Sequence, residues 1–96
     1  MKWPVHVACT NGDKEGEVQN LSIDGAFLQF SDRPNLNNNF KIVLKPSEHQ
    51  LIPITAEKIW AANFNIDGKR VFSGVGVRFT EICEADREFL RRATAI

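Results

Sequence analysis

The chain has 96 residues, which is enough for one domain and too few for two. Apolar residues make up 43% and charged residues 25%, as is ordinary for a soluble globular protein. The 12 acidic side chains balance the 12 basic ones, whereas a nucleic-acid-binding protein gains its affinity from an excess of lysine and arginine. We therefore expect one domain, residues 1–96, with no nucleic-acid polymer as its partner.

The cysteines and the N-terminal residues indicate the cellular compartment in which we expect the protein. Cys9 and Cys83 lie far apart, without a C-x-x-C pair or clustered histidines, so we expect no zinc site. They fit either one long-range disulfide or two buried free thiols, and a reducing cytoplasm favours the thiols. No apolar segment resembles a signal peptide or is long enough to span a bilayer. We expect a cytoplasmic location without direct membrane insertion, although a domain excised from a larger membrane protein would look the same.

Alternating apolar residues predict strands from the N-terminus onward. Residues 3–10 form the first expected strand, and Asn11-Gly12 is typical of a hairpin turn. The partner strand runs from about Gly16 into a polar segment, residues 20–25. A third strand then follows over residues 24–30.

The middle of the chain predicts a loop, a short strand and a long strand. Residues 31–39 are rich in asparagine and are expected to be a loop, and residues 40–45 alternate as a strand. After a turn at residues 46–50, one strand pattern runs over residues 51–63. Its expected faces are Ile52, Ile54, Ala56, Lys58 and Trp60 on one side and Thr55, Glu57 and Ile59 on the other. Since neither face stays uniform, we expect a bulge or a strong bend.

The last part of the chain predicts a hairpin followed by a helix. Asp67-Gly68 favours a turn, and residues 71–80 return as a strand. The apolar face of this strand is expected to hold Val71, Val75, Val77 and Phe79. Gly74 and Gly76 thin the other face, so a closing helix or a ligand would fit over it. Residues 84–95 change to a helical period.

The helical segment has the features of a helix packed on a sheet. Phe89, Leu90 and Ala93 form an apolar stripe, while acidic residues come early and arginines late, as the helix dipole favours. Hairpins in series that end in one amphipathic helix predict a small antiparallel β-barrel with a helix packed on it. The expected fold class is therefore all-β with one C-terminal helix.

Residues 20–25, Asn-Leu-Ser-Ile-Asp-Gly, separate two strand-like segments and are called the ledge below. Asn and Ser side chains hydrogen-bond nearby backbone and favour turns. Gly25 permits a conformation or a close approach that a Cβ would block. Two interpretations follow: a tight β-turn, or a polar surface that offers an amide, a hydroxyl and bare backbone to a ligand.

Two segments resemble the PilZ domain family. Residues 20–28, Asn-Leu-Ser-Ile-Asp-Gly-Ala-Phe-Leu, resemble its D/N-x-S-x-x-G signature. Residues 75–80 and 84–90 are similar to its last strand and following helix, so the resemblance spans nearly the whole chain. It implies a β-barrel of about six strands with a C-terminal helix. It also implies a bacterial receptor for cyclic di-GMP that is not an enzyme and signals to an attached domain or a downstream protein partner.

The resemblance implies a ligand site with two halves. One half is the ledge, here Asn20, Ser22 and Gly25, whose polar groups would meet a guanine edge or the ribose–phosphate ring. The other is an R-x-x-x-R motif ahead of the first strand, whose planar, charged side chains clamp phosphates and stack on guanine. This chain departs from that pattern, because its first arginine is Arg33. Lys2 stands near the position of the second arginine but lacks its planar fork, which implies weakened binding.

Two further residues are candidates for the binding site. Trp60 lies where some family members have an aromatic residue against the ligand, although a core or barrel-surface tryptophan is the alternative. Arg78 alternates with Gly76 and is placed to reach an anion over the thinned face, although a solvated strand arginine is the alternative. His6 and His49 show no pattern typical of catalysis and are expected at the surface or in a turn.

Three functions are compatible with the sequence. The first is a cyclic di-GMP receptor in which the arginine half of the site is degenerate. The second is a protein-interaction adaptor in pilus assembly or motility that does not bind the nucleotide. The third is an oligonucleotide-binding barrel with Phe27, Trp60, Phe64 and Phe72 as stacking platforms, which the balanced charge disfavours. We find no nucleophile with a base, no P-loop and no metal cluster, so we expect no enzyme and no cofactor.

Overall fold

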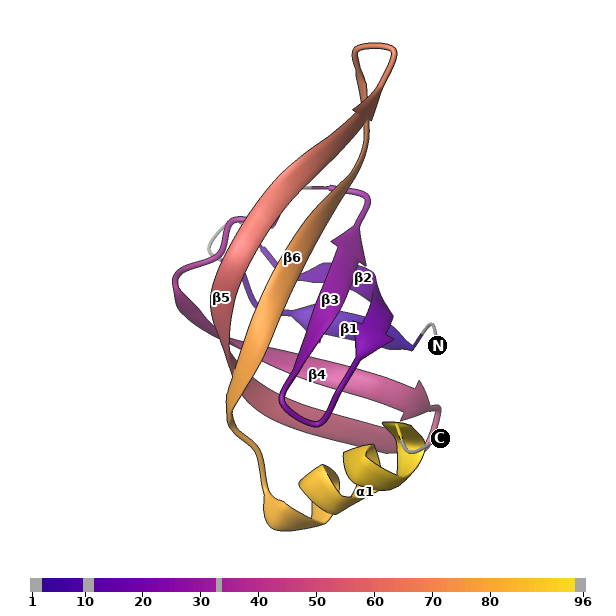
Figure 1. The fold of residues 1–96 in the computed structure, drawn as a ribbon, viewed down its shortest axis with the longest axis vertical. Helices are drawn as coiled ribbons and strands as arrows, with labels where there is room; N and C mark the ends of the chain where they lie inside the picture. Colours follow the sequence, from indigo (N-terminus) through magenta and orange to yellow (C-terminus); the bar gives the residue numbers. More distant parts are fainter. Residues whose placement is uncertain (1–2, 10–11, 33, 95–96) are drawn as a thin grey trace.

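The computed structural model describes residues 3–9, 12–32 and 34–94, which form a closed barrel of six antiparallel strands and one helix (Figure 1). The elements are β1 (Pro4–Val7), β2 (Lys14–Leu21), β3 (Gly25–Phe30), β4 (Asn39–Ser47), β5 (Gln50–Ile66), β6 (Lys69–Glu81) and α1 (Glu84–Thr94). Around the barrel the order is β1-β2-β3-β6-β5-β4, and pairing of β1 with β4 closes it. The predicted fold class is therefore confirmed.

Alternate residues of the strands fill the barrel. The buried hydrophobic residues are Val5, Val7, Val18, Leu28, Phe30, Phe40, Ile42, Leu44, Ile52, Ile54, Ala56, Val75, Val77, Phe79 and Leu90. The apolar face predicted for the last strand is among them, except for Val71, whose side chain lies outside the described part of the chain. Burying one such side chain contributes about 1.5–3 kcal/mol, so this interior is the main source of stability.

Helix α1 covers one end of the barrel, away from the tip of the β5–β6 hairpin (Figure 1). Leu90 is fully buried, and Phe89 and Ile82 are partly buried against the core. The ring of Trp3 lies 6.0 Å from the ring of Phe89, centroid to centroid. The predicted apolar stripe thus holds the helix against the barrel.

Strands β5 and β6 form a long hairpin that projects beyond the barrel (Figure 1). Its turn residues, Asp67 and Gly68, have φ of 54° and 78°, the positive values that a tight two-residue hairpin turn requires. β3 pairs with residues 73–78 of β6, and β4 with residues 50–57 of β5, so the outer part of the hairpin extends past both neighbours. The predicted turn is confirmed, although β5 ends beyond the expected residue 63.

A register shift between Lys58 and Trp60 confirms the irregularity predicted for the long strand. The extra residue reverses the alternation, and Trp60 therefore pairs with Gly76 on the outside of the barrel, where it is 44% exposed. The expectation that Trp60 shares a side with Ile52 and Ile54 is wrong, because those residues face the interior.

Other expectations were wrong in detail. Pro46 belongs to β4 rather than to a turn, and the turn consists of Glu48 and His49. Pro46 lies at the register shift between Leu44 and Ser47. Because the regular hydrogen bonding between β4 and β5 is already interrupted there, the missing N–H of the proline is tolerated. Asn11, in the first predicted hairpin turn, lies outside the described residues.

Both cysteines are free thiols, as favoured from the sequence, but only Cys9 is partly buried. Cys83 is exposed at the approach to α1, so the expectation of two buried thiols is wrong for Cys83. Within the described residues, the helix is too short and too polar to cross a bilayer.

Candidate functional site

The ledge joins β2 to β3 and is held by Ser22. The backbone N–H of Ser22 donates to the Gly25 carbonyl at 2.9 Å. Its hydroxyl oxygen accepts from the N–H groups of Asp24 at 3.3 Å and Gly25 at 3.2 Å, and the hydroxyl lies 3.3 Å from the Gly25 carbonyl, to which it donates. The N–H of Phe79 donates to the Asp24 carbonyl at 2.8 Å. Ser22 therefore acts first on the ledge itself, as the turn interpretation requires.

Asn20 precedes this turn, at an irregular position of β2. The register between β2 and β3 shifts between Val18 and Asn20, and Asn20 pairs with Phe27. The Asn20 side-chain oxygen accepts from the N–H of Leu21 at 3.0 Å, while the residue as a whole is exposed. The bulge thus presents a side-chain amide at the surface beside the ledge.

Gly25 is needed for the pairing of β3 with β6. A Cβ at this position would collide with the carbonyl oxygen of Val77 on the neighbouring strand. Its φ is not in the left-handed region, so the requirement is a close approach of backbones rather than a special conformation. This structural role exists whether or not a ligand also approaches Gly25.

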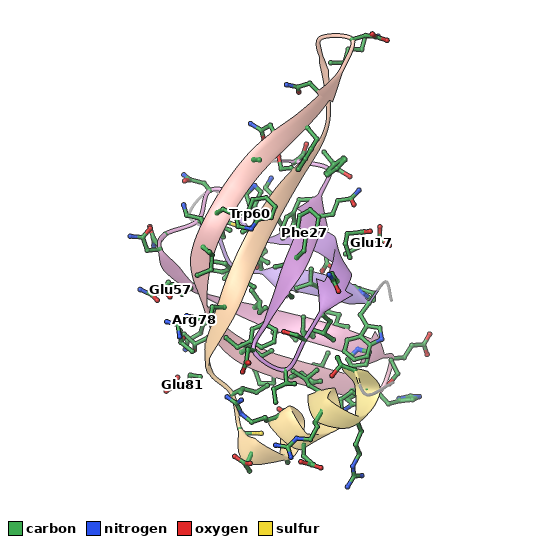
Figure 2. All side chains as sticks on the ribbon, in the orientation of Figure 1. Glu17, Phe27, Glu57, Trp60, Arg78 and Glu81 are labelled. Carbon is green, nitrogen blue, oxygen red and sulfur yellow. The ribbon has the colours of Figure 1, made fainter. Side chains whose placement is uncertain are left out.

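The ledge forms one wall of a pocket of about 340 Å³ on the outside of the barrel. Asn20, Ser22, Gly25 and Trp60, four residues singled out from the sequence, all line it. Aromatic side chains also line the pocket: the centroid of the Phe27 ring lies 5.2 Å from that of the Trp60 ring, at 41° between their planes (Figure 2). The pocket therefore combines a polar turn with an exposed aromatic surface.

Aromatic rings of the chain itself cover the two glycines of β6. A Cβ on Gly76 would lie 2.7 Å from Cε2 of Trp60, and a Cβ on Gly74 would lie 2.6 Å from Phe27 and 2.9 Å from Phe64. These rings occupy the face over which we expected a closing helix or a ligand, while α1 packs at the barrel end. The glycines thus let the Trp60 and Phe27 rings approach the backbone of β6 closely.

Arg78 borders the pocket but its charge is engaged elsewhere. It pairs with Gly25 across β3 and β6, directly after the pocket residue Val77. Its Nη2 and Nε donate to Oε1 of Glu57 at 2.7 and 3.1 Å, and Figure 2 shows both residues on the β5 side of β6. The Arg78 side chain is 58% exposed, as a solvated strand arginine would be, and it has a carboxylate partner as well. Lys2 lies outside the described residues.

Comparison with known proteins identifies the family. The family model of the PilZ domain matches residues 1–95. The chain belongs to the PilZ domain family. The solved structure of the "PilZ domain with c-di-GMP of YcgR from Escherichia coli" matches with a TM-score of 0.72 at 15% identity, covering 96% of this chain and 78% of that chain. This likeness shows the fold. None of the curated proteins matches the sequence.

Sequence reasoning about this PilZ domain missed three residues at or beside the pocket. Phe27 was named only as a stacking platform for an oligonucleotide, and its contact with Trp60 depends on the register of three strands. Ile59 lines the pocket because the bulge brings it there. Glu57 was predicted on the same side of its strand as Thr55 and Ile59, and the pairing of β5 with β6 makes it the partner of Arg78.

The PilZ barrel has another cavity of about 340 Å³, beside the loop between β3 and β4. In it, the Ser73 hydroxyl donates to Asn63 at 2.7 Å and the Lys58 ammonium donates to the Leu36 carbonyl at 3.4 Å. The ledge does not contribute to its lining.

Away from the pocket, His6 hydrogen-bonds Glu15 at 2.8 Å and Asp13 at 3.1 Å, while Lys45 donates to Glu15 at 3.3 Å. The hydrogen bond with Glu15 is the main cause that raises the pKa of His6. Among the described residues of the PilZ domain, the His, Cys, Asp and Glu side chains form no group of three or more that is arranged to hold a metal ion.

Proposed function

We propose that this chain is a receptor domain for cyclic di-GMP and that the ligand binds in the pocket between the ledge and Trp60. The supporting observation is that Asn20, Ser22, Gly25 and Trp60 line one pocket, although they come from β2, the turn, β3 and β5. The similar E. coli PilZ structure is described as a domain with c-di-GMP. We further propose that residues 1–96 act as a single cytoplasmic domain that signals to a downstream protein.

The two walls of the pocket suit the two chemical parts of the ligand. Trp60 and Phe27 offer aromatic faces to a guanine, and such stacking contributes about 1–3 kcal/mol per base. Asn20 offers an amide to a base edge or to the ribose–phosphate ring. Ser22 acts by holding the turn, because its hydroxyl already bonds the ledge backbone.

Arg78 and Arg87 lie near the proposed site, and each is paired with a carboxylate, that of Glu57 and that of Asp24 respectively. Residues 1–32 contain no arginine, so this segment does not supply the planar forks that the family resemblance implies for clamping phosphates. Arg78 is beside the pocket but bonded to Glu57. We therefore propose that affinity is lower than it would be with an intact arginine motif.

Isothermal titration with cyclic di-GMP tests this function. We expect binding in the micromolar range, reduced about tenfold or more by Trp60→Ala, because that substitution removes a stacking platform. Leu51→Ala is the matched control, since Leu51 is also an exposed apolar residue (62%) but does not line the pocket. Gly25→Leu is unsuitable, because it would break the β3–β6 pairing. A folded wild-type domain that does not bind at high micromolar ligand would contradict the proposal.

A protein-interaction adaptor is the second candidate, and the projecting β5–β6 hairpin favours it. Ile59 is 57% exposed and Phe64 is 39% exposed on this hairpin, which offers apolar surface to a partner. Capture experiments in the native host should then return a partner that is lost with Phe64→Ser and retained with Leu51→Ser. Equal capture by both variants would argue against the hairpin as the docking surface.

A further inference from the structure

Glu57 and Arg78 form an ion pair at the edge of the proposed nucleotide pocket. We propose that Glu57 is an internal competitor for Arg78: it holds the guanidinium on the β5 side of β6 until a phosphate of the bound nucleotide replaces it. This inference rests on the proposed function and names a residue that sets its affinity.

The positions of three residues across neighbouring strands support this role. Arg78 on β6 pairs with Gly25 of the ledge on one side and with Glu57 of β5 on the other. Gly25 has no side chain, and an ideal Cβ there would lie 3.5 Å from the Arg78 Cα. The surface between Arg78 and the ledge is therefore not filled by a side chain at position 25. A change of rotamer can carry the guanidinium from Glu57 toward the ledge.

The contact with Glu57 is well formed but exposed. Both hydrogen bonds, from Nη2 at 2.7 Å and from Nε at 3.1 Å, go to the same carboxylate oxygen, Oε1. The side chains of Arg78 and Glu57 are 58% and 38% exposed, so water and salt screen the pair. Replacing Glu57 by a ligand phosphate therefore costs little free energy. An arginine binds a phosphate with the same planar guanidinium group.

Glu57 also acts through its own charge. When the guanidinium turns to a phosphate, the Glu57 carboxylate is left beside an anionic ligand, and like charges repel. Asp24 of the ledge also carries a carboxylate, which has a cation of its own because it lies 3.7 Å from Nη1 of Arg87 on α1. Removal of the Glu57 charge should therefore both release Arg78 and reduce repulsion of the ligand.

Titration of the full chain with cyclic di-GMP, using wild type, Glu57→Gln, Arg78→Gln and the double variant, tests this role. We expect Glu57→Gln to bind about two- to fivefold more tightly, a factor typical of one exposed ion pair. The gain should vanish in the Arg78→Gln background. Glu81→Gln is the matched control, because Glu81 is also a carboxylate on the outside of the barrel but accepts from the Thr55 hydroxyl and lines a different cavity.

The outcomes separate this inference from the proposed function. Equal affinities of wild type and Glu57→Gln, with binding measurable, would overturn the role of Glu57 and leave the receptor function standing. An equal gain from Glu81→Gln, or a gain that persists without Arg78, would show a general charge effect and also overturn it. Failure of all folded variants to bind would overturn both.

Discussion

Gly76→Ala is expected to displace the Trp60 indole from the outer face of the barrel. The new Cβ would lie 2.7 Å from Cε2 and 2.8 Å from Cδ1 of that ring, well inside the roughly 3.5–4.0 Å of an ordinary carbon contact. Trp60 is 44% exposed, so its ring can move into solvent while the strands keep their pairing. The loss of stability caused by Gly76→Ala should therefore depend on the presence of the Trp60 indole.

The magnitude of that cost follows from the burial of Trp60. More than half of the residue is covered, and losing this cover costs about 1–2 kcal/mol on the usual area scale. Alanine in a strand is favoured over glycine by about 0.5–1 kcal/mol, which offsets part of the loss. We expect Gly76→Ala to destabilise the wild type by about 1 kcal/mol. In the Trp60→Ala background the same substitution should stabilise by about 0.5–1 kcal/mol.

Urea denaturation followed by circular dichroism measures both effects. For a domain of this size, a slope of about 1 kcal/mol per molar urea gives a midpoint about 1 M lower for Gly76→Ala. In the Trp60→Ala background the midpoint should rise by about 0.5–1 M. A change of the same sign and size in both backgrounds would refute the contact between Trp60 and Gly76.

Three further predictions concern the helix α1, the hydrogen-bonded pair of His6 and Glu15, and the two thiols. Leu90→Ala should cost about 2–5 kcal/mol, because Leu90 is fully buried under α1; a melting temperature lowered by less than about 4 °C would contradict this. The hydrogen bond between His6 and Glu15 raises the pKa of His6 above its ordinary 6.5 and lowers the pKa of Glu15 below its ordinary 4.5. The pair therefore stabilises the fold fully between pH 4.5 and pH 6.5. This stabilisation is lost as the pH rises through the raised pKa of His6, and also as the pH falls through the lowered pKa of Glu15. Wild type should therefore lose stability above about pH 6.5 relative to His6→Gln, and parallel pH profiles of their unfolding free energies would refute the pair. A thiol reagent should modify exposed Cys83 before half-buried Cys9, whose pKa is raised by burial, and equal rates would count against this burial.

Local signals in the sequence were sufficient for most of the fold. Asp67-Gly68 specified its turn because both residues tolerate positive φ. The alternation at Val75, Val77 and Phe79 placed the buried face of β6 correctly, and the helix bounds were nearly right. The resemblance to the PilZ family, based on the ledge and the C-terminal segments, is confirmed by the family model.

The geometry of the site depended on pairing between distant segments. A bulge or a strong bend was expected in residues 51–63, but its position beside Trp60, which transfers Trp60 to the outer face, follows from the register of β5 with β6. The ion pair of Arg78 with Glu57 likewise depends on the alignment of β5 with β6. Gly25 was interpreted as permitting either a special conformation or a close approach, and its contact with the Val77 carbonyl shows a close approach of the neighbouring strand β6.

The central claim is that cyclic di-GMP binds between the ledge and Trp60, and chemical-shift mapping tests it most directly. Amide and indole N–H resonances of the ¹⁵N-labelled chain would be followed during titration with the nucleotide. We predict the largest shifts at Ser22, Gly25 and the Trp60 indole N–H, which line the pocket. Shifts concentrated at Leu36 and Ser73, in the other cavity, or no shifts at high micromolar ligand, would contradict the claim.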